Sequence, residues 1–152
     1  MKSWWIHEAK LLAGSNPANR DLMPLRDDGF GLAVSLLDER TQPARYDKKA
    51  ATDRGWGVYK IPIEEGLMPS LVQMCEFASL VGVASKTTKV LVFCDIGLDR
   101  SAFMGAVYWI AKGLSAGEAI SLVERSAGVE RAWDEEAWHA GLRKFEALRW
   151  KI

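Results

Sequence analysis

Residues 89–113 read KVLVFCDIGLDRSAFMGAVYWIAKG, and this stretch decides the fold. Its beginning, residues 90–93, is a short apolar run with two β-branched side chains, which predicts a buried strand. Residues 101–112 carry apolar side chains at helical spacing and stop at Gly113, which predicts a helix. A tight loop joins the two. A strand, a short loop and a helix in this order are suited to bind an anion, because loop N–H groups and the positive end of the helix dipole converge there.

The loop carries side chains that suit a reaction at phosphorus. Cys94 lies where the helix dipole favours a thiolate, and a thiolate can attack a phosphorus atom. Arg100 can donate two hydrogen bonds to phosphoryl oxygens. Gly97 allows the backbone to curl, and the Ser101 hydroxyl can bond to the sulfur and make it a better leaving group. The predicted phosphate-binding residues are Asp95, Ile96, Gly97, Leu98, Asp99 and Arg100.

Length, charge and composition limit the remaining possibilities. The chain has 152 residues, enough for one domain with a substantial core. Its 20 basic and 20 acidic side chains balance, so no overall field attracts nucleic acid or an anionic membrane, and we expect neither as a partner. No apolar stretch approaches the roughly 20 residues of a transmembrane helix. Two cysteines, and no Cys/His cluster of zinc spacing, predict a reduced, cytoplasmic protein without a metal site.

The rest of the chain predicts an α/β domain. Extended segments are expected at residues 4–6, 10–13, 32–37 and 56–61. Further helices are expected at residues 19–28, 70–82, 115–126 and 133–151, with capping boxes at Ser70 and Ser115. Strands that alternate with helices, followed by helices alone, predict a mostly parallel central sheet of four to five strands with helices on both faces. Ligands bind beyond the carboxyl ends of such strands, which is where Cys94 lies.

Residues 38–55 are the most polar stretch and leave two interpretations open. They hold five basic side chains, which are Arg40, Arg45, Lys48, Lys49 and Arg54. After the first two residues, only Asp47 and Asp53 oppose them. The stretch is either a solvated loop or a basic rim that attracts an anionic substrate.

The segment from residue 90 to residue 113 resembles the signature His-Cys-x5-Arg-Ser/Thr of the cysteine-dependent protein tyrosine phosphatase superfamily. The resemblance extends over nearly the whole chain to the small atypical dual-specificity phosphatases, in residues 5–17, 33–36, 59–70 and 113–120. It implies a single dual-specificity phosphatase-like domain over residues 1–152, with the phosphotyrosine protein phosphatase-like fold. It also implies hydrolysis of phosphomonoesters through a phosphocysteine, without a metal or other cofactor. The expected substrates are phosphoproteins or small phosphomonoesters, and phosphate or sulfate is expected to occupy the loop.

The first departure from the family pattern is Phe93, which stands where the family usually has a histidine. In the family this histidine orders the loop and helps to keep the cysteine ionised, so we expect a slower enzyme. The departure also motivates an alternative function, a catalytically weak phosphate-binding or adaptor module of the same fold. Cys94 and Arg100 argue against that alternative, because binding alone does not need a thiol.

The second departure concerns the general acid. The family uses an aspartate in an upstream loop, and alignment through Pro62 and Pro69 places that position on Glu65. Asp99 competes for the role, because some branches of the superfamily carry an acid directly before the arginine. A glutamate can protonate a leaving oxygen, although it is one methylene longer than aspartate. We favour Glu65 for its position and keep Asp99 as the alternative.

The loop composition bears on the substrate. Lipid and inositol phosphatases of the superfamily often carry lysines in this loop, whereas residues 94–100 contain none. Two carboxylates, Asp95 and Asp99, also oppose a highly charged anion. A phosphoinositide phosphatase is therefore a weaker alternative, unless the basic stretch at residues 38–55 folds over the pocket.

Overall fold

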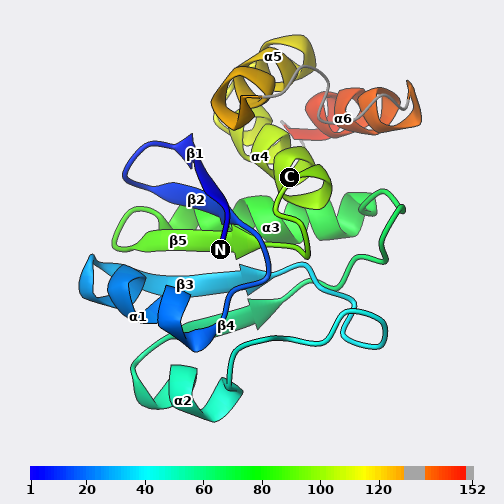
Figure 1. The fold of residues 1–152 in the computed structure, drawn as a ribbon. Helices are drawn as coiled ribbons and strands as arrows, with labels where there is room; N and C mark the ends of the chain where they lie inside the picture. The colour runs from blue at the N-terminus through cyan, green and yellow to red at the C-terminus, as the bar shows by residue number, and fades with distance from the viewer. Residues whose placement is uncertain (129–135, 150–152) are drawn as a thin grey trace.

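One sheet carries the five strands of the described chain in the order β1-β2-β5-β3-β4 (Figure 1). The computed structural model describes residues 1–128 and 136–149. The strands are β1 (Ser3–His7), β2 (Leu11–Gly14), β3 (Phe30–Ser35), β4 (Gly57–Lys60) and β5 (Lys89–Phe93). β1 and β2 are antiparallel, whereas the pairs β2–β5, β5–β3 and β3–β4 are parallel. The predicted mostly parallel sheet is confirmed.

Helices cover both faces of this sheet (Figure 1). They are α1 (Asn19–Asp27), α2 (Lys48–Asp53), α3 (Leu71–Ala84), α4 (Asp99–Ala111), α5 (Ala116–Ala127) and α6 (Glu136–Leu148). α1 and α2 lie on one face, and α3 to α6 lie on the other. The predicted capping boxes open α3 at Ser70 and α5 at Ser115. The prediction of a single α/β domain with helices on both faces is thus confirmed.

The alternation of side chains along β5 divides the core into two layers. Val90, Val92 and Cys94 pack in the layer beneath α3 to α6. Leu91 and Phe93 pack in the layer beneath α1 and α2. Burial on both faces is what a central parallel strand requires. Because strand side chains alternate, Cys94 and Phe93 face opposite sides of the sheet.

Several elements differ from their predicted bounds. β3 spans Phe30–Ser35 rather than residues 32–37, because Phe30 already pairs with Lys89 of β5. Leu36 and Leu37 follow the strand as buried loop residues. α4 begins at Asp99, two residues early, so that its first turn lies within the predicted loop. The polar residues 38–55 are not all loop, since they contain α2. The last predicted helix corresponds to α6, and residues 133–135 and 150–151 lie outside the described residues.

Two kinds of feature are absent from residues 1–128 and 136–149. No helix there is long and apolar enough to cross a membrane. Nor do three or more His, Cys, Asp or Glu side chains gather there in a way that would hold a metal ion.

Candidate active site

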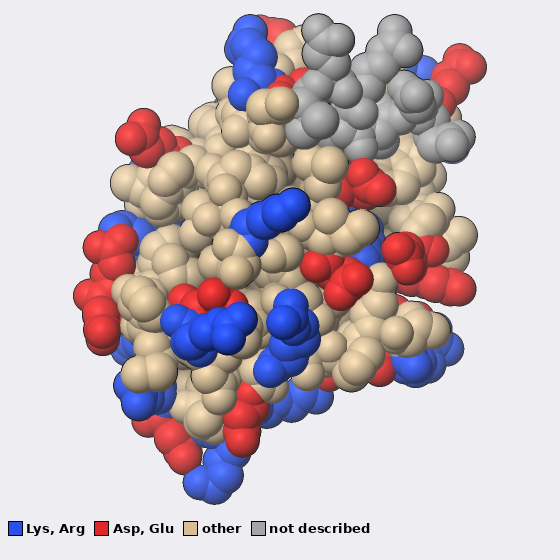
Figure 2. Space-filling view, in the orientation of Figure 1, with Lys and Arg blue, Asp and Glu red and all other residues tan. Residues whose placement is uncertain are grey.

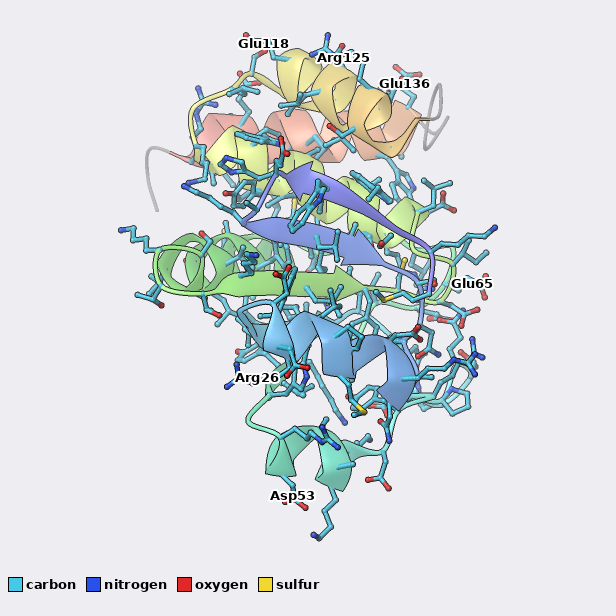
Figure 3. All side chains as sticks on the ribbon, turned by 60° about the vertical axis from the view of Figure 1, so that its left-hand side comes forward. Arg26, Asp53, Glu65, Glu118, Arg125 and Glu136 are labelled. Atoms are coloured by element: carbon cyan, nitrogen blue, oxygen red, sulfur yellow. The ribbon has the colours of Figure 1, made fainter. Side chains whose placement is uncertain are left out.

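The parallel strands β3, β4 and β5 end at one edge of the sheet, and the loops that follow them meet there (Figure 1). The phosphate loop, residues 94–100, follows β5 and includes the first two residues of α4. The acid loop, residues 62–69, follows β4, and the β3 loop, residues 36–47, follows β3. Figure 3 shows Glu65 of the acid loop beyond the end of β5. This edge is where parallel sheets bind their ligands.

Cys94 is a free thiol that lies directly after β5 and is only 2% exposed. The Ser101 Oγ donates a hydrogen bond to the Cys94 Sγ over 3.2 Å. Ser101 belongs to the first turn of α4 and is fully buried. The structure therefore brings the predicted nucleophile and the predicted hydroxyl donor together. Both lie at a helix N-terminus, where the helix dipole stabilises negative charge.

The backbone of the phosphate loop is free to bind an anion. Two of its carbonyls are bonded to other parts of the protein, because the Asp95 O accepts from the Asn16 N at 3.1 Å and the Gly97 O accepts from the Trp4 Nε1 at 2.9 Å. Its N–H groups are not, since within the described chain those of residues 95–100 donate to no backbone carbonyl. These donors and the N-terminus of α4 are therefore available to bind an anion together.

Gly97 occupies a position that only glycine fits. Its φ is +83°, in the left-handed region that side chains disfavour. A Cβ at this position would lie 2.5 Å from the Ser15 N and 2.6 Å from the Gly14 C. The phosphate loop therefore packs its backbone directly against the end of β2.

Arg100 connects the phosphate loop to the acid loop. Its side chain is buried, at 4% exposed, and its Nη1 donates a hydrogen bond to the Ile63 O over 2.9 Å. A guanidinium has five N–H donors. One bond to a carbonyl therefore leaves donors for phosphoryl oxygens and ties the guanidinium to the acid loop.

Both candidate acids, Glu65 and Asp99, lie at this edge of the sheet. Partial burial raises the pKa of Asp99; the neighbouring Arg100 lowers it, and the negative charge of Glu65 raises it again. Glu65 is exposed, and its Oε2 accepts a hydrogen bond from the Gln42 Nε2 over 3.0 Å. The structure thus brings the two carboxylates close enough for their charges to interact.

Phe93 is fully buried on the face of the sheet opposite to Cys94. Its ring meets the ring of Tyr46 edge-on, with centroids 6.0 Å apart and planes at 89°. Tyr46 comes from the β3 loop and is itself 6% exposed. An aromatic pair therefore fills the place where the family pattern has an imidazole.

Several basic side chains of residues 38–55 are paired with acids. The ion pairs are Arg40–Asp38, Lys48–Glu39 and Lys49–Asp53, with N–O distances of 2.9, 2.7 and 2.9 Å. Figure 2 shows basic and acidic side chains interspersed over one face of the molecule. A basic rim that attracts an anion needs cations without acidic partners. The pairing of these three basic side chains therefore favours a solvated segment, and α2 forms part of that segment.

Three contributors to the site have no signal in the sequence. They are the side chains of Gln42 and Asn16 and the carbonyl of Ile63. Each acts across two loops that are distant in the chain. The Asn16 Nδ2, for example, donates to the Pro43 O over 3.0 Å. Amide and carbonyl groups occur everywhere in a sequence, so only the fold identifies these particular ones.

The fold and the buried cysteine at a strand–helix junction define a cysteine-dependent phosphatase of the dual-specificity type. Residues 5–141 match the family model PTP-NADK, described as DSP-PTPase phosphatase fused to NAD+ kinase. The chain belongs to this family of phosphatases. No protein of curated function matches the sequence.

Solved structures agree with the family. Tk-PTP in the active form is 26% identical, with a TM-score of 0.80 over 95% of this chain and 96% of that one. PTPMT1 in complex with PI(5)P is 18% identical, with a TM-score of 0.82 over 95% and 94%. Human DUSP28 is 21% identical, with a TM-score of 0.74 over 95% and 93%. The last two likenesses support the fold alone.

Proposed function

We propose that this phosphatase hydrolyses phosphomonoesters through a covalent phosphocysteine on Cys94. The observation that carries the proposal is the buried thiol with the Ser101 Oγ at 3.2 Å, at the N-terminus of α4. Arg100 directly precedes Ser101 in the same turn of the helix, where its guanidinium can bind phosphoryl oxygens. A thiol that served only for packing would not need a hydroxyl donor on its sulfur.

The reaction has two steps. In the first, the Cys94 thiolate attacks phosphorus, so that an S–P bond forms while the P–O bond to the leaving group breaks and an acid protonates the leaving oxygen. In the second, water attacks phosphorus and gives a proton to the same carboxylate, while the P–S bond breaks and inorganic phosphate leaves. Arg100 and the N–H groups of residues 95–100 bind the phosphoryl oxygens throughout. The Ser101 hydroxyl stabilises the departing thiolate.

We assign the acid role to Glu65. The hydrogen bond from Arg100 to Ile63 ties the acid loop to the phosphate loop only two residues before Glu65. The Glu65 carboxylate is exposed, so it can meet the leaving group at the open side of the site. Asp99 is the alternative, because its raised pKa also favours a protonated carboxyl.

Phosphorylated tyrosine, serine or threonine side chains, or small phosphomonoesters, suit the site as substrates. A single phosphoryl group matches the loop donors and Arg100. Asp95 and Asp99 oppose further negative charge, and Arg40 is already paired with Asp38. These charges disfavour polyphosphoinositides, and PI(5)P in the complex with PTPMT1 belongs to a structure that is only 18% identical.

The decisive experiment compares the wild type with Cys94→Ser on 4-nitrophenyl phosphate. We expect turnover and a phosphoprotein trapped by rapid acid quench for the wild type, and neither for Cys94→Ser. Cys75→Ser is the matched control, since Cys75 lies on α3 and should be dispensable. Equal rates for the wild type and Cys94→Ser would refute the proposal. Tight binding of a phosphopeptide without turnover would instead support the adaptor alternative.

We further propose that residues 1–152 act as one phosphatase domain in the cytoplasm. A thiolate nucleophile must stay reduced, and cytoplasmic surroundings keep thiols reduced. Oxidation of Cys94 would stop the reaction, so activity should depend on a reducing agent during purification. Recovery of turnover on adding a thiol reductant tests this requirement.

A further inference from the structure

Gln42 is a buried side chain beside the proposed acid. It lies in the β3 loop and is only 7% exposed. Its Nε2 donates to the Glu65 Oε2 over 3.0 Å. Its Oε1 is buried as well and accepts no hydrogen bond from the described residues. One end of the amide is thus bonded to Glu65, while the other end is bonded to nothing in the described chain.

The position of Gln42 is fixed relative to the phosphate loop. Its backbone N–H donates to the Asp38 O over 2.8 Å, and the carbonyl of the next residue, Pro43, accepts from the Asn16 side chain. The Asn16 backbone in turn donates to the Asp95 O. Gln42 is therefore a fixed point, whereas Glu65, on an exposed loop, is the adjustable partner.

We propose that Gln42 is the positioning residue for Glu65 in both of its protonation states. The proposal rests on the proposed function, because the two states matter only if Glu65 exchanges a proton with the substrate and with water. An amide carries a donor and an acceptor. Its N–H bonds to the carboxylate, as observed, and its carbonyl oxygen accepts from the carboxylic acid after a half-turn of the amide. Since the Oε1 has no other partner among the described residues, the half-turn breaks no second hydrogen bond.

The charges around Glu65 explain why a neutral partner suits it. Asp99, in the first turn of α4, repels the negative charge of Glu65. Arg100, in the same turn, attracts the negative charge of Asp99. In the acid loop, Glu64 directly precedes Glu65, and its negative charge attracts Arg40 of the β3 loop. A lysine or arginine at position 42 would hold Glu65 as the carboxylate and oppose proton donation. Glutamine holds the side chain in place without selecting a charge state.

The test uses substrates that differ in their need for an acid. Gln42→Met removes the donor and the acceptor at similar length. We expect kcat/KM for a phosphoserine peptide to fall about threefold to tenfold, the equivalent of one net hydrogen bond. We expect less than about a twofold change for 4-nitrophenyl phosphate, whose leaving group needs little protonation. Gln42→Asn keeps the amide but shortens it, so it should show the same selectivity.

Two comparisons make the test specific. Gln73→Met is the matched control, because Gln73 braces the same loop through the Pro62 O at 2.8 Å and its bonds there do not involve Glu65. It should change both substrates alike. The double variant Gln42→Met/Glu65→Gln should lose no more activity than Glu65→Gln alone.

Three results would overturn the inference. The first is an equal loss on both substrates for Gln42→Met, and the second is additive losses in the double variant. The third is a Glu65→Gln variant with unchanged dependence on the leaving group. In each case turnover by the wild type and its loss in Cys94→Ser would leave the proposed function standing. A wild type without turnover would overturn both.

Discussion

The phosphate loop and the acid loop meet at the same edge of the sheet, but they are held in different ways. In the phosphate loop, Cys94 donates its N–H to the Gly14 O, Gly97 packs on the backbone of β2, and Arg100 is buried. In the acid loop, residues 64–68 are all exposed; even the apolar side chain of Leu67 is 54% exposed. The phosphate loop is anchored by its backbone, whereas the acid loop is held by a few individual hydrogen bonds.

This difference matches the two tasks of the proposed reaction. Binding the phosphoryl group requires donors fixed at defined distances before the reaction begins, since preorganised donors need no rearrangement in the transition state. Donating a proton requires a carboxyl that can reach leaving groups of different size. The bond between Arg100 and the Ile63 O connects the two loops, so that the fixed loop sets the range of the adjustable one.

The largest expected effect comes from the anchored loop. Arg100→Ala removes two charge-assisted hydrogen bonds to the phosphoryl group, each worth about 1.5–3 kcal/mol. We expect kcat/KM for 4-nitrophenyl phosphate to fall about 100- to 10,000-fold. Arg40→Ala is the control, since Arg40 is 82% exposed and already bonded to Asp38, and it should change the rate less than about threefold. Similar losses in the two variants would restore the basic-rim interpretation.

The next effect compares one glycine from each loop. Gly97 and Gly66 have φ values of +83° and +82°, but a Cβ at Gly97 would meet backbone at 2.5 Å, whereas one at Gly66 would meet nothing within 4 Å. Gly66→Ala should cost only about 1 kcal/mol of unfolding free energy for its conformation. Gly97→Ala should cost more than this and lower kcat/KM at least about tenfold, because the loop must leave β2. Urea unfolding and steady-state rates measure both, and equal costs would mean that the contact with β2 does not hold the loop.

Much of the anchored region could be predicted from the sequence. The apolar run before Cys94 and the helical spacing after it reveal a buried strand and a helix, because burial imposes their periodicity. Gly97 between them indicates the tight curl. The start of α4 was predicted two residues late, since Asp99 and Arg100 are polar and only the closed turn shows them to be helical. α2 was missed for the same reason, because only Ala51 of its six residues is buried.

The adjustable region could be predicted only in part. Alignment through Pro62 brings Glu65 to the site, but the amide of Gln42 that holds it comes from another loop and follows no spacing rule. The alternation of β5 sends Phe93 away from Cys94, yet its partner Tyr46 is 47 residues distant in the chain, from residue 46 to residue 93. Contacts between loops depend on tertiary packing, which leaves no periodic trace in the sequence.

A smaller effect is expected from the buried Phe93 ring, which directly precedes the phosphate loop. Phe93→His places a polar ring in a fully buried apolar site against Tyr46, so we expect a loss of about 1–3 kcal/mol of unfolding free energy. The resemblance to the family predicts a faster reaction at the acidic end of the pH profile for the same variant. Phe93→Leu is the control, which should lose stability through the smaller side chain without any gain in rate. A stable Phe93→His variant with an unchanged profile would mean that the loop and α4 alone control Cys94.

The smallest effect concerns the two carboxylates, one from each loop. The negative charge of Glu65 helps to raise the pKa of Asp99, so Glu65→Gln should lower that pKa. An acid with a raised pKa in the folded state binds its proton more tightly there than in the unfolded chain. Its stabilising contribution is therefore present at low pH and is lost as the pH rises through the folded-state pKa. Removing the repulsion should increase the unfolding free energy at neutral pH and have no effect near pH 3, about where carboxyl groups become protonated.

The size of this gain should be less than about 1 kcal/mol, because solvent screens exposed charges. Urea unfolding at pH 7 and near pH 3, together with an NMR titration of the Asp99 carboxyl, measures it. Glu64→Gln is the matched control, since Glu64 is not among the charges that raise the pKa of Asp99. If Glu64→Gln gave the same gain, the effect would reflect overall charge and not the meeting of the two loops. If only Glu65→Gln gives it, the charge of Glu65 acts on Asp99 as it does in the structure, and the adjustable loop lies within reach of the anchored one before any substrate binds.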